Sequence, residues 1–284
     1  MWIVLSLFTA LCEAIKDGLC KKGLQGNNFL VIAWAWKAFS LPFLLPLSFI
    51  TPVPEYLSLR FLGILALGGG LNILATILYI RAIQASDLSL TLPLLSFTPI
   101  FLLFTSPLMV GDKPEPTGFL GVFLIFLGSY ILGSSKPGFW GPIKGLFSEK
   151  GPRLMLCVAL IWSIAANVDK MGIRETSPFF WAFCVQAFIA SGLTLLLFKQ
   201  QKSISLGSRK NIFLLSLIGL FTAMGLISQM SAVNIGLVPY VIAIKRLSIV
   251  FGVIIGALVF KEKDLKLRLC GAMIMLAGVF LMTA

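Results

Sequence analysis

Residues 82–132 read AIQASDLSLTLPLLSFTPIFLLFTSPLMVGDKPEPTGFLGVFLIFLGSYIL, and residues 232–282 read AVNIGLVPYVIAIKRLSIVFGVIIGALVFKEKDLKLRLCGAMIMLAGVFLM. Each stretch runs from an alanine through a long apolar segment and an acidic residue to a second, glycine-bearing apolar segment. A shift of 150 residues pairs Ala82 with Ala232, Gln84 with Asn234, Asp112 with Glu262, Gly121 with Gly271 and Gly128 with Gly278. These matches indicate an internal repeat.

The composition is that of a membrane protein. Of the 284 residues, 58% are hydrophobic and 12% are charged, and a soluble protein could not expose so apolar a surface. Apolar runs of about 20 residues predict transmembrane helices. We expect ten, at 2–20, 29–50, 61–80, 88–110, 117–134, 153–171, 179–198, 212–231, 238–260 and 269–283. Nothing is left over for a soluble catalytic or nucleic-acid-binding domain, so we expect no nucleic-acid partner.

A longer connection divides the predicted helices into two sets of five. It is rich in Gly, Pro and Lys, a loop composition. We therefore expect a first repeat at 1–134, a cytoplasmic linker at 135–152 and a second repeat at 153–284. Because five is odd, the second repeat is expected to be inverted relative to the first. Inverted repeats around a midplane site are typical of secondary transporters.

The basic residues predict the orientation. The loops after the odd-numbered helices carry fifteen of the 23 Lys and Arg, whereas the opposite loops carry Arg60, Lys113, Lys170 and Arg174. The positive-inside rule then places the odd-numbered loops in the cytoplasm and both termini outside. The net charge of +12 is accordingly read as a topology signal.

The sequence contains no histidine, which excludes Ser-His-Asp and Cys-His chemistry and most zinc sites. The five cysteines lie singly, without metal-ligand spacing, and we expect them to be packing residues: Cys12, Cys20, Cys157, Cys184 and Cys270. We therefore expect no enzymatic activity, no cofactor and no metal.

The two quoted stretches resemble the EamA repeat of the drug/metabolite transporter superfamily. The pattern of an acidic residue followed by a glycine-bearing helix, as in Glu262, Gly271 and Gly278, carries the resemblance, which covers nearly the whole chain in duplicate. It implies an all-α integral membrane protein, with ten transmembrane helices arranged as two inverted five-helix repeats, and a transport function. It does not imply a substrate. Asp112 departs from the family pattern, which commonly has Glu there.

Lys245 and Arg246 are the first candidates for substrate binding. They lie in the middle of the predicted helix 238–260, where a charge costs about 2.5–3.5 kcal/mol and needs a partner or a cavity. The plastid phosphate translocators are similar here, and the resemblance implies an anion site at these two residues. The alternative is that both form ion pairs with Glu13 or Asp17. Because neighbouring helical residues point about 100° apart, one can bind a ligand while the other binds a carboxylate.

Further charges lie on the first two predicted helices. Glu13, Lys16 and Asp17 share one face of the first helix. Glu13 is a candidate proton- or substrate-responsive carboxylate, or else a neutralising partner for the predicted helix 238–260. Lys37 beside Trp36 suggests a cavity for an anionic or amphipathic ligand.

Asn72, Thr76 and Tyr79 form a polar stripe on the third predicted helix, at a spacing of one and two turns. They are candidates for ligand hydrogen bonds, or else for bridges between helices. Together, the buried cations Lys16, Lys37, Lys245 and Arg246 exceed the acids Glu13 and Asp17 by two, and a bound anion would balance the difference.

The sequence therefore predicts a secondary transporter that moves a small anionic or zwitterionic metabolite by alternating access across the cytoplasmic (inner) membrane. One alternative is an exporter of amphipathic drugs or of a lipid-linked intermediate. Another is a non-transporting membrane subunit or an intramembrane enzyme. The expected partners are a small-molecule substrate and the lipid bilayer, and monomer and homodimer both stay open.

Overall fold

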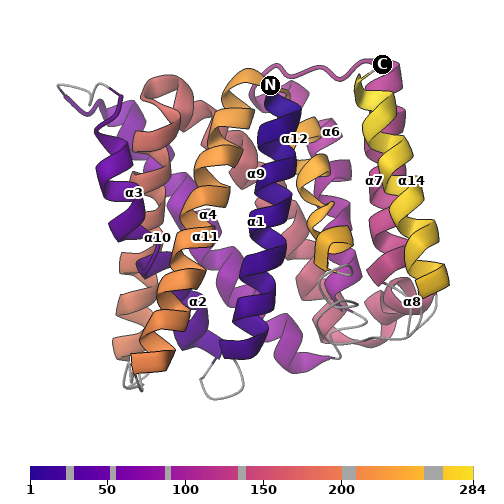
Figure 1. Cartoon of the computed structure of the whole chain (residues 1–284), viewed down its shortest axis with the longest axis horizontal. Coiled ribbons are helices and arrows are strands. Elements are labelled where there is room, and N and C mark those ends of the chain that lie inside the picture. The colour runs from indigo at the N-terminus through magenta and orange to yellow at the C-terminus, as the bar shows by residue number, and fades with distance from the viewer. Residues whose placement is uncertain are drawn as a thin grey trace.

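The structure is a computed structural model, and it describes residues 1–23, 29–51, 56–86, 91–133, 139–199, 209–252 and 265–283. Every regular element in these ranges is a helix (Figure 1). The helices are α1 (Trp2–Gly23), α2 (Phe29–Ala38), α3 (Leu41–Ser48), α4 (Leu59–Ala85), the 3₁₀ helix η1 (Leu92–Ser96), α6 (Phe97–Met109), α7 (Pro116–Gly133), α8 (Gly141–Ser148), α9 (Lys150–Glu175), α10 (Pro178–Lys199), α11 (Arg209–Ile235), α12 (Val238–Lys245) and α14 (Leu265–Thr283).

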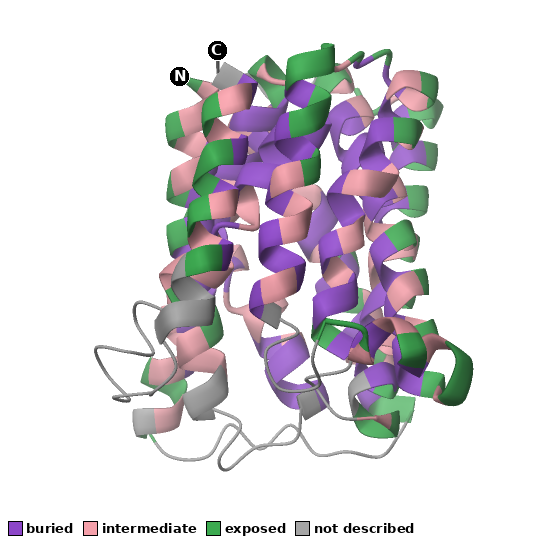
Figure 2. Ribbon diagram, turned by 90° about the vertical axis from the view of Figure 1, so that its right-hand side faces the viewer, coloured by how far each residue is buried: buried purple, intermediate pink, exposed green. Residues whose placement is uncertain are grey.

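The helices form one bundle with apolar outer faces. In the described part, six segments are long and apolar enough to cross a membrane: Leu30–Ser48, Leu59–Ala82, Leu92–Met109, Lys150–Glu175, Pro178–Lys199 and Asn211–Ile235. The apolar helices in α7 and α14 are shorter. Exposed residues lie mainly on the outside of the bundle and buried residues inside it (Figure 2). The predicted all-helical membrane fold is confirmed.

Pairs of helices from the two halves pack against each other in a two-fold pattern. The best-packed pairs are α1 with α11, α4 with α9, and α7 with α14. Under the 150-residue shift α1 corresponds to α9 and α4 to α11, so the first pair maps onto the second, while α7 and α14 map onto each other.

The helices α7 and α14 correspond under the 150-residue shift and run antiparallel, since Gly121 meets Gly278 and Gly128 meets Gly271, so the repeat is inverted. Two hydrogen bonds give the direction of the other two pairs. The Ser228 hydroxyl donates to the Leu5 carbonyl at 2.9 Å, so the start of α1 lies beside the end of α11. The Gly151 amide donates to the Ser86 hydroxyl at 3.3 Å, so the start of α9 lies beside the end of α4. Both pairs are antiparallel. The two chain termini lie at the same end of the bundle (Figure 1).

The glycines that revealed the repeat form the contact between α7 and α14 at one edge of the bundle (Figure 1). A Cβ atom built on Gly278 would lie 2.6 Å from the carbonyl oxygen of Gly121, and one on Gly128 would lie 2.5 Å from that of Gly271. No residue larger than glycine fits at such a distance, so the two backbones are in direct contact.

Several helix boundaries differ from those expected. The predicted linker 135–152 contains α8, and α9 already begins at Lys150. The predicted helix 29–50 is two helices, because a turn at Phe39 and Ser40 separates α2 from α3. Pro42, in the first turn of α3, has no amide hydrogen to continue α2. Residues 253–260 of the predicted helix 238–260 lie outside the described residues.

Two further helices are interrupted at positions related by the repeat. In the described part of the predicted helix 88–110, the 3₁₀ helix η1 precedes α6. In the predicted helix 238–260, α12 ends at Lys245, a turn follows at Arg246 and Leu247, and residues 248–252 are helical again. The junction of Ser96 with Phe97 corresponds to Arg246 and Leu247 under the 150-residue shift. Interrupted helices near the midplane are the usual place of a transporter's binding site.

Candidate functional site

A cavity of about 270 Å³ lies between the two halves. Its walls come from α1, α2, α4, α9, α10, α11 and α12, together with the junction of η1 and α6 and the turn after α12. In the part of the chain that the structure describes, neither α7 nor α14 contributes to the lining, as expected for peripheral helices. Seven acidic and basic residues line it: Glu13, Lys16, Asp17, Lys37, Asp169, Lys245 and Arg246.

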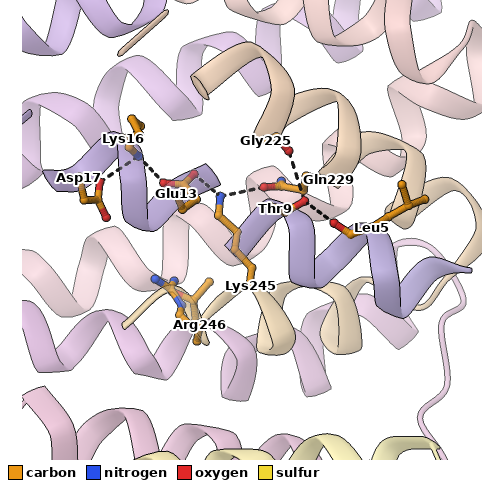
Figure 3. A network of polar contacts seen from close by, with 10 residues as sticks. Leu5, Thr9, Glu13, Lys16, Asp17, Gly225, Gln229, Lys245 and Arg246 are labelled. Atoms are coloured by element: carbon orange, nitrogen blue, oxygen red, sulfur yellow. Dashed lines mark hydrogen bonds and ion pairs between the residues drawn. The ribbon is translucent and has the colours of Figure 1, made fainter. Parts of the chain in front are cut away.

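Four of these form a connected group, the α1 charge cluster: Glu13, Lys16, Asp17 and Lys245. One carboxylate oxygen of Glu13 pairs with Lys16, and the other lies 3.0 Å from Nζ of Lys245. Lys16 also lies 3.1 Å from Asp17, and Lys245 donates to Oε1 of Gln229 at 2.7 Å (Figure 3). With two acids and two bases, the cluster balances its own charge.

Lys245 and Arg246 therefore have different surroundings, although they are neighbours in sequence. Lys245 lies in the last turn of α12, where helix dipoles favour a cation, and is bound to a carboxylate. This matches the ion-pair alternative for Lys245. Arg246 lies outside the chain of contacts (Figure 3), and no described carboxylate pairs with it.

Thr98 holds Arg246 at the cavity wall. Pro99 has no amide hydrogen for the carbonyl of Leu95, and the Thr98 hydroxyl donates to that carbonyl instead, at 2.8 Å. The same hydroxyl oxygen accepts from Nη2 of Arg246 at 2.9 Å. The Nε atom of Arg246 is buried and has no acceptor among the described residues. Among the described residues, the hydrogen-bonding capacity of the guanidinium is thus only partly used.

Lys37 is a second cation without a carboxylate. It lies in the last turn of α2, so the helix break described above places a charge at the cavity wall. Its Nζ is 5.1 Å from the centre of the Trp36 ring, and Nζ of Lys16 is 4.6 Å from the same ring. Trp36 thus contacts two cations by its π-system. In the described part of the chain, no acidic group pairs with Lys37.

Asp169 on α9 is a lining residue that the sequence reasoning missed. It is 8% exposed, and its Oδ1 accepts from Nε1 of the fully buried Trp181 at 2.9 Å. A signal was present, because Asp169 and Lys170 form a charged doublet just before the expected helix end at 171. The cavity therefore holds four cations and three carboxylates, and the expected excess of two positive charges is corrected to one.

The polar stripe of α4 only partly faces the cavity. Asn72 and Tyr79 line it, whereas Thr76 is absent from the lining and donates its hydroxyl to the Asn72 carbonyl at 2.8 Å. The Asn72 amide donates to the carbonyl of Gly68 at 2.9 Å. Tyr79 packs against Trp162, with ring centres 5.9 Å apart. Of the three candidates, Thr76 is therefore the one whose hydroxyl bonds within its own helix and does not line the cavity.

The cavity differs at its two ends. Near the chain termini, Asp112 and Lys170 form a buried pair at 2.7 Å, with 6% and 9% of their side chains exposed. At the other end Asp17 lines the cavity, and 64% of its side chain is exposed, so water reaches this end. Glu262, which corresponds to Asp112 in the second repeat, lies outside the described residues.

The comparisons with known proteins match both halves of the chain. The profile of the EamA-like transporter family matches residues 1–134 and 150–284. The chain belongs to the EamA-like transporter family. An "Uncharacterized transporter" from Archaeoglobus fulgidus is 23% identical to it over 283 residues, covering 99% of this chain and 97% of that protein.

A solved crystal structure, described only as that of a protein, has the same fold as this EamA-like transporter. The TM-score is 0.81 at 12% identity, covering 99% of this chain and 98% of the other. Such a likeness shows the fold alone. The two EamA domains and the transporter class nevertheless agree with the reading of the sequence, and the protein belongs to a family of transporters, not enzymes.

Proposed function

We propose that this EamA-like transporter is a secondary transporter that moves a small metabolite with an anionic group by alternating access. The observation that carries the proposal is the pair of unbalanced cations at the cavity wall, Lys37 from the first repeat and Arg246 from the second. A ligand held by both would contact both halves of the molecule. A conformational change that moves the halves relative to each other would then act on the bound ligand directly.

The volume and access of the cavity also support the proposal. A cavity of about 270 Å³ lies just below the range for drug-sized ligand sites, about 300–1,000 Å³, which suits a small metabolite. We infer one-sided access from two observations: Asp112 and Lys170 form a buried pair toward the end near the termini, whereas the side chain of Asp17, which lines the cavity toward the other end, is exposed. The basic residues favour a cytoplasmic-membrane protein with both termini outside, and in that orientation the open end faces the cytoplasm.

The charged wall also weighs against the alternative of an exporter of amphipathic drugs or lipid-linked intermediates. Trp36, Tyr79 and Trp162 would suit an amphipathic ligand. Such a ligand would, however, leave Lys37 and Arg246 without a counter-charge in a low-dielectric site, which is costly.

The test is binding and transport by the purified protein. Anionic, zwitterionic and neutral metabolites are screened by thermal shift, and those that bind are followed by counterflow in proteoliposomes. We expect anionic groups to be required, and Lys37→Met and Arg246→Gln each to reduce binding, while Lys144→Gln, which removes an exposed cation on α8, leaves it unchanged. Binding of neutral amphipaths with no dependence on Lys37 or Arg246 would contradict the proposal.

A further inference from the structure

Asp169 is a charged group of the cavity that anion binding does not explain. One of its carboxylate oxygens accepts from the Trp181 indole, a neutral donor. Among the described residues there is no second hydrogen-bond donor to this carboxylate and no cation paired with it. Since a buried carboxylate without a cation is costly, the free oxygen needs a donor, preferably a charged one.

The neighbouring cations are not available as partners in the same way. Lys37 and Lys245 are both within electrostatic range of Asp169. Lys245, however, is bound to Glu13 and Gln229, and neither it nor Lys37 forms an ion pair with Asp169. The cavity thus holds an unpaired carboxylate together with two unpaired cations, Lys37 and Arg246.

This arrangement of one carboxylate and two cations is complementary in charge to a zwitterion, which carries one positive and one negative group. A ligand with only an anionic group would be attracted by Lys37 and Arg246 but repelled by Asp169. A ligand that also carries an ammonium would bind all three groups. The excess of one positive charge in the cavity would then give only a weak preference for anions. Trp181 is fully buried, so its bond to Oδ1 fixes the carboxylate orientation before any ligand enters.

We propose that the substrate is a small zwitterion whose ammonium binds Asp169 and whose carboxylate or phosphate binds Arg246 and Lys37. This inference rests on the proposed function and specifies its substrate class. It assigns Asp169 a role in selectivity for ligands with an ammonium, since the anionic group of the ligand would already bind to Arg246 and Lys37.

Matched ligand pairs test this role. Each zwitterion is compared with its N-acetyl derivative, which keeps the anionic group but loses the ammonium. One series consists of α-amino acids and their N-acetyl derivatives, and the other of phosphoethanolamine and its N-acetyl derivative, so the two series distinguish carboxylate from phosphate. Binding is measured by thermal shift and titration calorimetry, and transport by counterflow.

The variants separate a specific contact from the general charge of the cavity. Asp169→Asn removes the charge, Asp169→Ser is a second neutral variant, and Asp169→Glu retains the charge. Asp17→Asn is the matched control, because it removes a carboxylate from the same cavity at a position already paired with Lys16.

In the wild type we expect the zwitterion of one series to bind at least about tenfold more tightly than its N-acetyl derivative, as for a hydrogen-bonded charge pair. This preference should vanish in Asp169→Asn and Asp169→Ser and persist in Asp169→Glu and Asp17→Asn.

Equal binding of zwitterion and N-acetyl derivative by the wild type would overturn the inference even if no variant folds. It would not contradict the proposed function, which is transport of a metabolite with an anionic group. A preference that survives in Asp169→Asn, or that Asp17→Asn abolishes equally, would overturn it as well. Failure of every anion and zwitterion to bind the folded wild type would overturn the proposed function itself.

Discussion

The ammonium of Lys170 donates to both carboxylate oxygens of Asp112, at 2.7 and 2.9 Å, and so joins α9 of the second repeat to the segment after α6 of the first. The pair is also bonded to the backbone between α11 and α12. Asp112 accepts from the amide of Val238 at 2.8 Å, and Lys170 donates to the carbonyl of Gly236 at 2.9 Å. A hydrogen-bonded ion pair therefore joins the two halves at the end of the bundle near the termini, and we expect it to close the cavity there.

Asp112→Asn should destabilise the protein strongly. It leaves the buried Lys170 without its counter-charge, and removing one partner of a buried pair costs about 3–5 kcal/mol. We expect a clear drop in the melting temperature of the purified protein. Glu115→Gln, which neutralises an exposed carboxylate at the same end, should have little effect. The double variant Asp112→Asn, Lys170→Met should regain much of the loss, and no recovery would contradict a role for the pair itself.

The same pair should control access from its end. In a cysteine-free background, Thr98→Cys places a thiol in the cavity. A membrane-impermeant thiol reagent added on the side of the termini should label it faster when Asp112→Asn is also present, because the halves separate more readily. Glu115→Gln in the same background is the control and should leave the labelling rate unchanged. Equal labelling rates with and without Asp112→Asn would show that the closure lies elsewhere.

Lys245 and Arg246 should respond differently to loss of charge. Lys245→Met leaves Glu13 with fewer partners, so it should lower the melting temperature, and Glu13→Gln should partly restore it in a double-mutant cycle. Arg246→Gln removes no ion pair, so it should leave the melting temperature nearly unchanged while weakening binding of anionic ligands about tenfold or more, the value of a charge-assisted hydrogen bond. The reverse pattern would assign the ligand to Lys245.

Gly278→Ala should destabilise the contact of α7 with α14. The added Cβ would lie 2.6 Å from the Gly121 carbonyl oxygen, and overpacking of this kind costs about 1–3 kcal/mol. Gly70→Ala on α4 is the matched control, because a Cβ there meets nothing within 4 Å. It should be neutral or slightly stabilising, since alanine favours helix by up to about 1 kcal/mol. Thermal unfolding of the two variants compares them, and equal behaviour would contradict direct backbone contact.

Both termini are predicted to lie outside the cytoplasm, from the distribution of basic residues. A reporter that is active only in the cytoplasm, fused after the last residue, should therefore give little signal. The same reporter inserted after Lys144, in the predicted cytoplasmic linker, is the positive control. A strong signal from the C-terminal fusion would reverse the assigned orientation and, with it, the face to which the cavity opens.

The sequence was sufficient for features that depend on one helix at a time. Apolar length predicted the membrane helices, the 150-residue shift predicted the repeat, and the odd number of helices in each half predicted its inversion. The glycines singled out by that shift turned out to touch across α7 and α14. Local sequence carries this information because the hydropathy of a segment and the absence of a side chain at glycine have the same effect wherever the helix packs.

Tertiary structure decided which charges meet. Lys245 and Arg246 are adjacent in sequence, yet one contacts Glu13 and the other Thr98, because the turn after α12 directs them to different helices. Asp169 reaches the cavity only because α9 packs between α4 and α6 with this face inward. The sequence alone determined which segments are apolar helices and which charges they carry. Helix rotation, crossing and interruption set the partner of each charge, and these depend on contacts between residues far apart in the chain.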